Sequence, residues 1–160
     1  MIRSLTLVLG IVVVVFFLAQ APKSDKKSLR VVDPASDVQA FTAQAPGGAV
    51  PHAMPADWKP TVSSYEQDTG LLRIGWVTPK NHYAEYAAQT GAAGSFLADI
   101  TDRATSVGTV DVDGVAWTEY RKDKAISLVR SYGSTLVVLG TLRDTASLDE
   151  LRLLAGRLAT

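Results

Sequence analysis

From Trp58 onward, the chain consists of short runs of β-branched, aromatic and aliphatic residues separated by turn-forming residues. The runs over 61–66 and 71–78 flank a turn-like connection over 67–70, which predicts a hairpin. The run over 83–90 alternates aromatic and small residues, a pattern that suits a strand or a short helix. Because prolines and glycines bracket this run, we predict a strand. Short strands at such spacing are typical of an antiparallel sheet.

The dipeptide Asp113-Gly114 is the clearest turn signal in the sequence. Asp-Gly supplies the two positive φ angles that a type I′ hairpin turn requires. Pairing across this turn sets Val112 opposite Val115 and Val110 opposite Trp117, so all four side chains share one apolar face. The sequence therefore predicts a hairpin centred on this dipeptide.

A further hairpin is predicted over 125–141, with either Gly133-Ser134 or Tyr132-Gly133 at its tip. Its second strand contains Leu136-Val137-Val138-Leu139, which is apolar on both faces. A strand of this kind is central in its sheet and covered on both sides. We expect helices or loops to provide that cover.

Two helices are predicted beside the sheet. Ser95 can cap a short helix over 95–103, which we expect to lie across the sheet. Near the C-terminus, Ser147 and Glu150 form a capping box. A stripe at helical spacing follows, made of Leu148, Leu151, Leu154, Ala155 and Leu158. We predict an α+β domain over 58–160, a mostly antiparallel sheet of five to seven strands packed with one short internal helix and a C-terminal helix.

The N-terminal segment over 4–21 contains no charged residue. As an α-helix it would reach about 27 Å, close to the ~30 Å hydrocarbon core of a bilayer. This length suits a membrane anchor or a signal peptide. The small-x-small sequence over 19–21 resembles a signal-peptidase site, but Pro22 directly after it normally blocks cleavage. We therefore predict an uncleaved transmembrane signal-anchor over 4–21, preceded by a cytoplasmic leader over 1–3.

The basic residues around this segment and the overall layout of the chain give opposite indications of its orientation. The leader carries only Arg3, whereas four basic residues follow the segment: Lys23, Lys26, Lys27 and Arg30. The positive-inside rule therefore favours a cytoplasmic C-terminus. A short leader before a long folded domain is instead the usual layout of an exported protein, and long domains can translocate despite flanking charge. We predict a single-pass protein of the cell membrane with its C-terminal domain outside the cytoplasm.

The segment over 22–57 is rich in proline and glycine, and we predict that it is a tether between the anchor and the domain. Within it, Ser36-Asp37-Val38-Gln39 has the S-x-x-Q form of a capping box, which favours one short helix. A mostly extended linker is the alternative.

Charge and cysteine content exclude several classes of protein. The 160 residues include 16 Lys+Arg, 16 Asp+Glu and no cysteine. A balanced charge without a Lys/Arg stripe lacks the positive field that nucleic-acid binders use, so we expect no nucleic-acid partner. The absence of cysteine excludes disulfides, thiolate zinc sites, thiol nucleophiles and the lipid-modified cysteine of a bacterial lipoprotein.

The sequence predicts no catalytic residue, no cofactor and no metal site. Its two histidines, His52 and His82, are isolated, whereas a metal site needs several converging ligands. The sequence also lacks a nucleophile elbow, a dinucleotide-binding glycine motif and a P-loop. One mixed aromatic and polar group is a candidate ligand or partner surface: Trp76, Asn81, His82, Tyr83 and Gln89. The alternative is that Trp76 is a core residue and the others belong to a turn.

The most distinctive motifs are Arg73-Ile74-Gly75-Trp76-Val77-Thr78-Pro79 and Val112-Asp113-Gly114-Val115-Ala116-Trp117, with Tyr83, Gln89-Thr90 and Phe96-Leu97 between them. Together they resemble a family of actinobacterial single-anchor membrane proteins with a domain of unknown function. The resemblance covers the leader and about 58–160. It implies a short membrane anchor and a domain in the cell envelope, and it assigns no catalytic residue.

Three functions are compatible with these observations. The leading hypothesis is a non-enzymatic, membrane-tethered domain that binds an envelope protein or ligand. The alternative is a hydrolase-like envelope enzyme with a site built from dispersed residues, such as His82 with Asp99 or Asp102, and this site requires hydrogen-bond contact between them. The third is an accessory subunit of a larger membrane complex, with Leu153 as a candidate contact residue.

Overall fold

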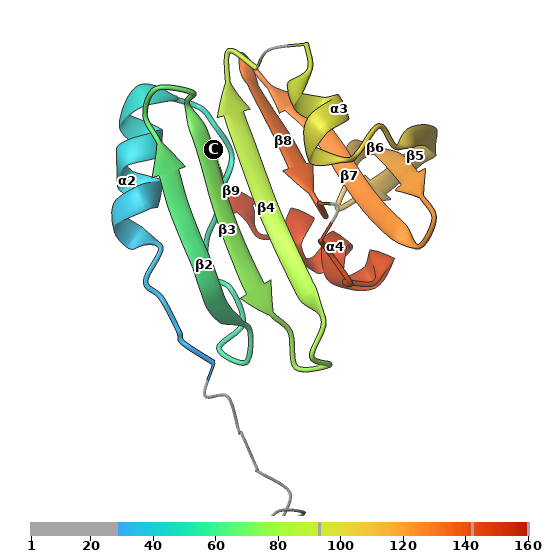
Figure 1. The fold of residues 1–160 in the computed structure, drawn as a ribbon, viewed down its shortest axis with the longest axis horizontal. Helices are drawn as coiled ribbons and strands as arrows, with labels where there is room; N and C mark the ends of the chain where they lie inside the picture. Colours follow the sequence, from blue (N-terminus) through green and yellow to red (C-terminus); the bar gives the residue numbers. More distant parts are fainter. Residues whose placement is uncertain (1–28, 93, 142, 160) are drawn as a thin grey trace, which may run out of the picture.

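The computed structural model describes residues 29–159 except 93 and 142, and its main element is a seven-stranded antiparallel sheet (Figure 1). The strand order is β2-β3-β4-β8-β7-β6-β5. The strands span β2 Lys59–Glu66, β3 Leu71–Val77, β4 Tyr83–Thr90, β5 Thr105–Val112, β6 Val115–Lys122, β7 Ala125–Tyr132 and β8 Thr135–Leu139. Three helices pack with the sheet: α2 Ala35–Gln44, α3 Phe96–Ile100 and α4 Leu148–Ala155. The predicted α+β class is therefore confirmed, with one helix more than predicted.

The hairpin turns lie where the sequence predicts them. Asp113 and Gly114 have φ angles of 53° and 79°, as a type I′ turn requires. Val112 pairs with Val115, and the next pairs continue this register toward Trp117. The turn between β7 and β8 consists of Gly133 and Ser134, so the first of the two predicted tips is the right one. The strand predicted over 83–90 is β4, with the predicted bounds.

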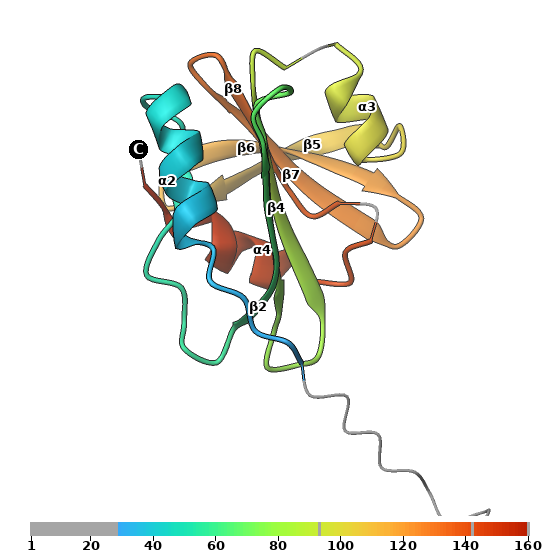
Figure 2. The same ribbon diagram turned by 60° about the vertical axis from the view of Figure 1, so that its left-hand side comes forward.

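Strand β8 is the fourth of the seven strands and is covered on both faces, as predicted. Val137 and Leu139 belong to the main core cluster, together with residues of α2 and α4. Val138 points to the opposite face, where a smaller cluster includes Phe96 of α3. We call the face toward α2 and α4 the inner face and the face toward α3 the outer face (Figure 2).

Helix α2 is part of the folded domain, which corrects the prediction of a tether over the whole of 22–57. Phe41 on α2 is completely buried in the main core, and Ala45 is nearly so. The predicted capping box is also wrong, because the helix has Pro34 at its N-cap and begins at Ala35, which leaves Ser36 inside the first turn. Proline is favoured at helix starts because its φ angle is already fixed near the helical value. The extended-linker alternative is excluded over 35–44.

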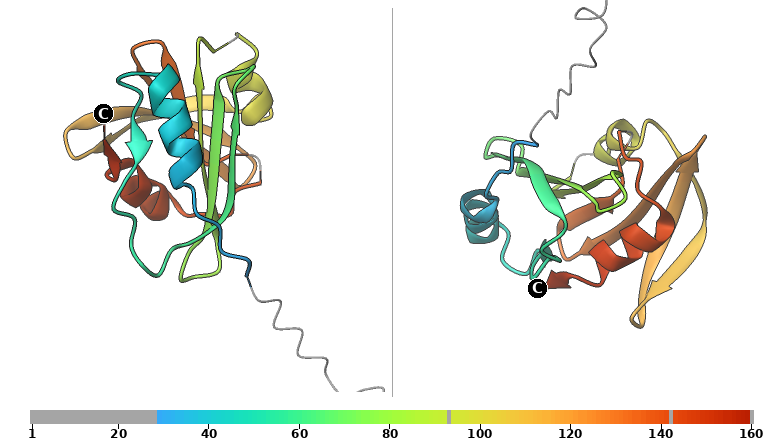
Figure 3. Two further views of the ribbon diagram at one scale, coloured as in Figure 1. Left: turned by 90° about the vertical axis from the view of Figure 1, so that its left-hand side faces the viewer. Right: turned by 90° about the horizontal axis from the view of Figure 1, so that it is seen from below.

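Helix α4 begins with the predicted capping box. The Ser147 hydroxyl accepts from the Glu150 amide, and the Glu150 carboxylate accepts from the Ser147 amide. The helix ends at Ala155, earlier than its apolar stripe predicts, because Leu158 belongs to the two-residue strand β9 (Leu158–Ala159). This strand pairs with β1 (Val50–Pro51), a segment of the predicted tether. Figure 3 shows the sheet curving around α4 on the inner side.

Helix α3 covers the outer face but is shorter than the predicted span of 95–103. Asp102 and Arg103 have φ angles of 52° and 58°, which are incompatible with a continuing α-helix, and the helix ends at Ile100. Ser95 occupies the N-cap position, but its side chain makes no capping hydrogen bond. Phe96 nevertheless packs on Ala87, Val129 and Val138 of the sheet, so the helix lies on the sheet as expected.

The predicted leader, the anchor over 4–21 and the first part of the tether lie outside the described residues. Within the part of the chain that the structure describes, no helix is long and apolar enough to cross a membrane.

Candidate functional site

The five residues of the predicted surface do not form one surface. Trp76 on β3 is 2% exposed and belongs to the inner core, as the alternative interpretation expects. Asn81 and His82 lie in the turn between β3 and β4. Tyr83 begins β4 and points to the outer face, while Gln89 lies near the other end of the same strand. Trp76 therefore faces the inner core, whereas Tyr83 and Gln89 share the outer face but lie at opposite ends of β4.

Tyr83 and Gln89 have separate surroundings on β4. The Tyr83 ring covers Gly75 of the neighbouring strand and leaves no room for a side chain there, which explains the glycine inside β3. Burial raises the pKa of Tyr83 to about 12, and the nearby Glu85 carboxylate acts in the same direction. Gln89 instead donates from Nε2 to the carbonyl of Thr69, 2.9 Å away. The two side chains have different partners, so no shared chemistry follows from their presence on one strand.

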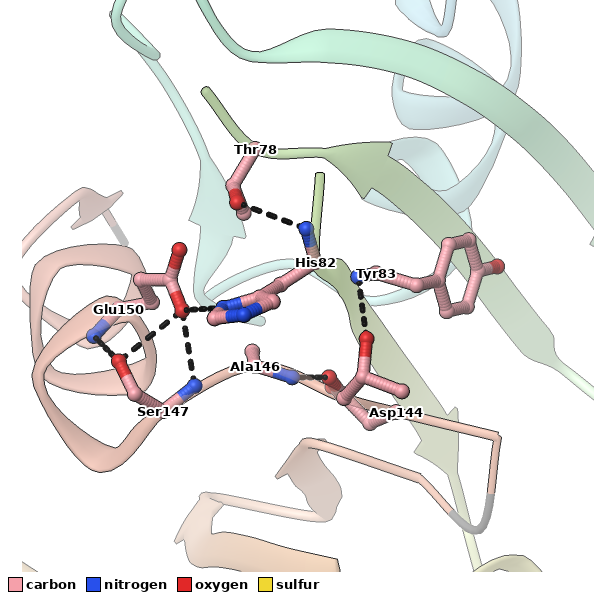
Figure 4. A network of polar contacts seen from close by, with 8 residues as sticks. Thr78, His82, Tyr83, Asp144, Ala146, Ser147 and Glu150 are labelled. Atoms are coloured by element: carbon pink, nitrogen blue, oxygen red, sulfur yellow. Dashed lines mark hydrogen bonds and ion pairs between the residues drawn. The ribbon is translucent and has the colours of Figure 1, made fainter. Parts of the chain in front are cut away.

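Of the five predicted residues, His82 takes part in a polar network that joins its turn to the first turn of α4 (Figure 4). Its Nδ1 lies 2.8 Å from Oε2 of Glu150. The same Oε2 accepts hydrogen bonds from the Ser147 amide at 2.8 Å and the Ser147 hydroxyl at 2.9 Å. The His82 amide donates to Oγ1 of Thr78 at 3.2 Å, which fixes the turn that carries the imidazole. We call His82, Glu150, Ser147 and Thr78 the His82 cluster.

The His82 cluster stabilises a carboxylate rather than a carboxylic acid. Burial alone would raise the pKa of Glu150, but hydrogen bonds from His82, Ser147 and Thr78 outweigh it and lower the pKa to about 2. Glu150 is therefore ionised at neutral pH and accepts a hydrogen bond from the Nδ1–H of His82. The carboxylate has two functions, since it caps α4 and also fixes the orientation of the imidazole.

The geometry around His82 does not contain the parts of a hydrolytic site. A carboxylate-oriented imidazole activates a nucleophile through its second nitrogen. In the described part of the chain, no hydroxyl group hydrogen-bonds to Nε2 of His82, and the Ser147 hydroxyl donates to Glu150 instead. The predicted pairing of His82 with Asp99 or Asp102 is wrong, because Asp102 pairs with Lys122 and Asp99 belongs to α3 on the outer face.

A pocket of about 330 Å³ adjoins the His82 cluster. It lies between the turn after β3, the segment before β2 and helix α4. Its lining combines apolar and charged side chains, namely Pro55, Asp57, Trp58, Pro79, Lys80, Asp149, Glu150 and Leu153. Leu153, which the sequence indicates as a candidate contact residue, is 39% exposed at this pocket. We call this pocket, together with His82, the anchor-side surface, because it lies at the end of the sheet where the chain that follows the predicted anchor enters the domain.

Sequence reasoning missed Glu150 as the partner of His82, although it identified both residues separately. The signal was available in the capping box, since the glutamate of such a box presents a carboxylate at a helix start. Nothing in the sequence indicated that a turn 68 positions away would approach it. In the described ranges 29–92, 94–141 and 143–159, no group of three His, Asp or Glu residues has the arrangement of a metal site.

The chain belongs to a family of proteins of unknown function, the DUF4245 family, whose model matches residues 1–158. The match includes both the N-terminal apolar segment and the folded domain. No curated protein and no solved structure matches the chain.

Proposed function

We propose that this protein is a single-pass, membrane-anchored domain of the cell envelope that binds a ligand or a partner protein at its anchor-side surface and does not catalyse a reaction. The observation that carries this proposal is that the chain which follows the N-terminal apolar segment enters the domain beside Pro60, at the end of the sheet where that surface lies. The uncharged residues 4–21 are long enough for a short membrane anchor.

The distance between the apolar segment and the domain is short. Only eight peptide units separate Ala21 from Leu29, so the two residues are at most about 29 Å apart. The packing of α2 on the sheet is the reason, since it removes most of the predicted tether from the connection. With residues 4–21 in a bilayer, the domain would lie close to the membrane surface.

We also infer which end of the domain would face the membrane. The amide of Val32 donates to the carbonyl of Pro60 at 2.9 Å, so the chain enters beside the first residues of β2. Lys59 at that end pairs with Val77, directly before the turn that carries His82. The turn between β2 and β3, which contains Asp68, lies at the opposite end of these strands (Figure 1). The anchor-side surface would therefore face the membrane, where it could meet an envelope partner or a ligand at the bilayer.

Cysteine labelling tests the location and the orientation, because the natural chain contains no cysteine. We expect a membrane-impermeant maleimide to label Asp68→Cys and Lys80→Cys in intact cells, and to label Ile2→Cys only after permeabilisation. The mass of the labelled protein is expected to be that of the full chain. Protection of both domain positions in intact cells, with labelling of Ile2→Cys, would contradict the proposed orientation.

Depth measurements in lipid nanodiscs test the membrane-facing end separately. A fluorophore at Lys80→Cys should be quenched by labelled lipid more strongly than one at Asp68→Cys, because β3 separates the positions by about 20 Å. Equal quenching would show that the domain has no preferred orientation relative to the bilayer and would overturn this part of the proposal.

A further inference from the structure

On the outer face of the sheet, we propose a second binding site, which takes a small carboxylic acid with an apolar body. The site is a pocket of about 300 Å³ between β3, α3 and the segment after β8. It lies on the face opposite α4 and does not depend on the membrane anchor or on the anchor-side surface. Three features of the pocket support the assignment: a fixed arginine, a second cation at the rim and an apolar floor.

The fixed arginine is Arg73, which is held by a buried carboxylate. Its Nε lies 2.5 Å from Oε1 of Glu85, a residue that is 1% exposed. The other carboxylate oxygen of Glu85 accepts a hydrogen bond from the Thr141 hydroxyl at 2.8 Å. Glu85 contacts only Nε of the guanidinium. The terminal Nη groups of Arg73 make no hydrogen bond to any residue that the structure describes. Two parallel N–H groups of a guanidinium are suited to bind a carboxylate.

The second cation is Arg143, which is exposed at the rim of the pocket. It makes no ion pair with any residue that the structure describes. Across the pocket, Asp99 of α3 is likewise exposed. The two arginines are therefore balanced by Asp99 and by Glu85 behind Arg73, which leaves the site close to neutral. A near-neutral site with free guanidinium donors favours a monoanion over a multiply charged phosphate.

The floor of the pocket is apolar. It consists of Leu71, Phe96 and Ile100, which all belong to the smaller core cluster on the outer face. Apolar surface here is removed from water only in part, since α3 is just five residues long. A hydrocarbon or aromatic group placed on this floor would gain the burial that the protein itself does not provide. The combined lining thus fits a carboxylate joined to a small apolar group.

The volume limits the size of the ligand. A pocket of about 300 Å³ is at the lower end of the range for small-molecule sites, so it suits a ligand the size of 3-phenylpropionate. A ligand of this size would bind with a Kd on the order of 1 mM. The exposed Asp99 is also placed to accept from an ammonium group, so free carboxylic acids and apolar α-amino acids share the required chemistry.

Isoleucine methyl NMR spectra of the full chain in lipid nanodiscs provide the test. On addition of 3-phenylpropionate, we expect the Ile100 methyl signal to shift and saturate, while Ile74 in the inner core does not respond. Arg143→Gln should weaken binding at least about threefold, because it removes one cation without touching a buried group. Arg152→Gln on α4 is the matched control and should leave the affinity unchanged.

Three comparison ligands decide the outcome. Equal affinity for the uncharged 3-phenylpropan-1-ol would show binding to the apolar floor or the lipid alone and would overturn the proposal. Equal affinity for inorganic phosphate would show a general anion site and would overturn it as well, as would the absence of any shift at Ile100. If Asp99 accepts from the ammonium group of L-phenylalanine, this amino acid should bind more tightly than 3-phenylpropionate to the natural chain but not to the Asp99→Asn variant. Tighter binding of L-phenylalanine to the natural chain alone would therefore support the site and restrict its ligands to amino acids.

Discussion

The two faces of the sheet differ in how they are covered. On the inner face, α2 and α4 enclose side chains that are completely buried or nearly so, such as Phe41, Trp117 and Leu151. On the outer face, the five-residue helix α3 covers only part of the sheet, and a polar group around Arg73 and Glu85 lies beside it. The inner face therefore provides most of the burial that stabilises the domain, whereas the outer face retains space that a ligand can fill.

One buried acid near each face also differs from the other, in the direction of its pKa shift. Glu150 at the inner helix α4 receives hydrogen bonds from several side chains and from an amide, and its pKa is lowered to about 2. Asp144 near the outer-face group accepts from the amides of Glu85 and Ala146 at 3.0 and 2.7 Å. Burial nevertheless raises the pKa of Asp144 to about 7. Burial favours the neutral form of both acids, and only Glu150 has enough donors, including an imidazole, to reverse that effect.

The largest expected effect is that of removing an inner-face aromatic residue. Phe41→Ala should destabilise the domain by about 3–5 kcal/mol, because the side chain is completely buried in the main core. Urea unfolding would measure the change, and Gln39→Ala on the exposed side of α2 is the control. A cost below about 1 kcal/mol would show that α2 is only loosely attached, and the longer tether would then again be the better description.

A smaller effect is expected from Glu150→Gln. The carboxylate has a folded-state pKa of about 2 and an ordinary value of 4.5, so its contribution to stability is present above pH 4.5 and lost as the pH falls toward 2. The variant should be less stable than the natural chain by about 2–3 kcal/mol at pH 6 and should lack this acid-dependent loss. Asp149→Asn, whose side chain is 88% exposed, should retain the pH dependence. If Glu150→Gln retains it too, the His82 cluster does not stabilise the carboxylate.

Removing an outer-face aromatic residue should cost less than removing Phe41. Phe96→Ala should destabilise the domain by about 2 kcal/mol, since Phe96 is 8% exposed at the edge of a pocket where its neighbours can relax. The same urea titration would compare it directly with Phe41→Ala. Equal losses for the two variants would remove the energetic distinction between the faces.

The smallest effect near neutral pH is expected from Asp144→Asn. The folded-state pKa of Asp144 is about 7 and its ordinary value is 3.8, so ionisation opposes folding and stability falls as the pH rises from about 4 to about 7. The variant should lack this fall. Near neutral pH its net stability should change little, because it removes the cost of ionisation but also loses one of the two oxygens that accept from backbone N–H groups. Unfolding midpoints across this pH range would measure the slope, and Asp123→Asn at the exposed β6–β7 turn should leave it unchanged. A natural chain without the fall would contradict the raised pKa.

Much of the sheet could be predicted from the sequence because its signals are local. Asp113-Gly114 fixes a turn through the φ angles of two adjacent residues, and the apolar run in β8 requires cover on both faces. The role of α2 could not be predicted, because one Phe41 among small residues, prolines and glycines gives no amphipathic pattern. The end of α3 was missed because non-glycine residues adopt the left-handed conformation of Asp102 and Arg103 only rarely, and no local pattern marks these two residues for it.

The fold class, most strand bounds, the capped C-terminal helix and the uncharged N-terminal segment can all be predicted from the amino-acid sequence. Each of these follows from neighbours in the chain, through side-chain periodicity, turn geometry or capping. Three features emerge only in the folded domain: α2 closes the core, His82 contacts Glu150, and Glu85 holds Arg73 at a pocket. These contacts join side chains far apart in the sequence, and their formation depends on how the sheet curves and which face each helix covers, quantities that no local pattern encodes.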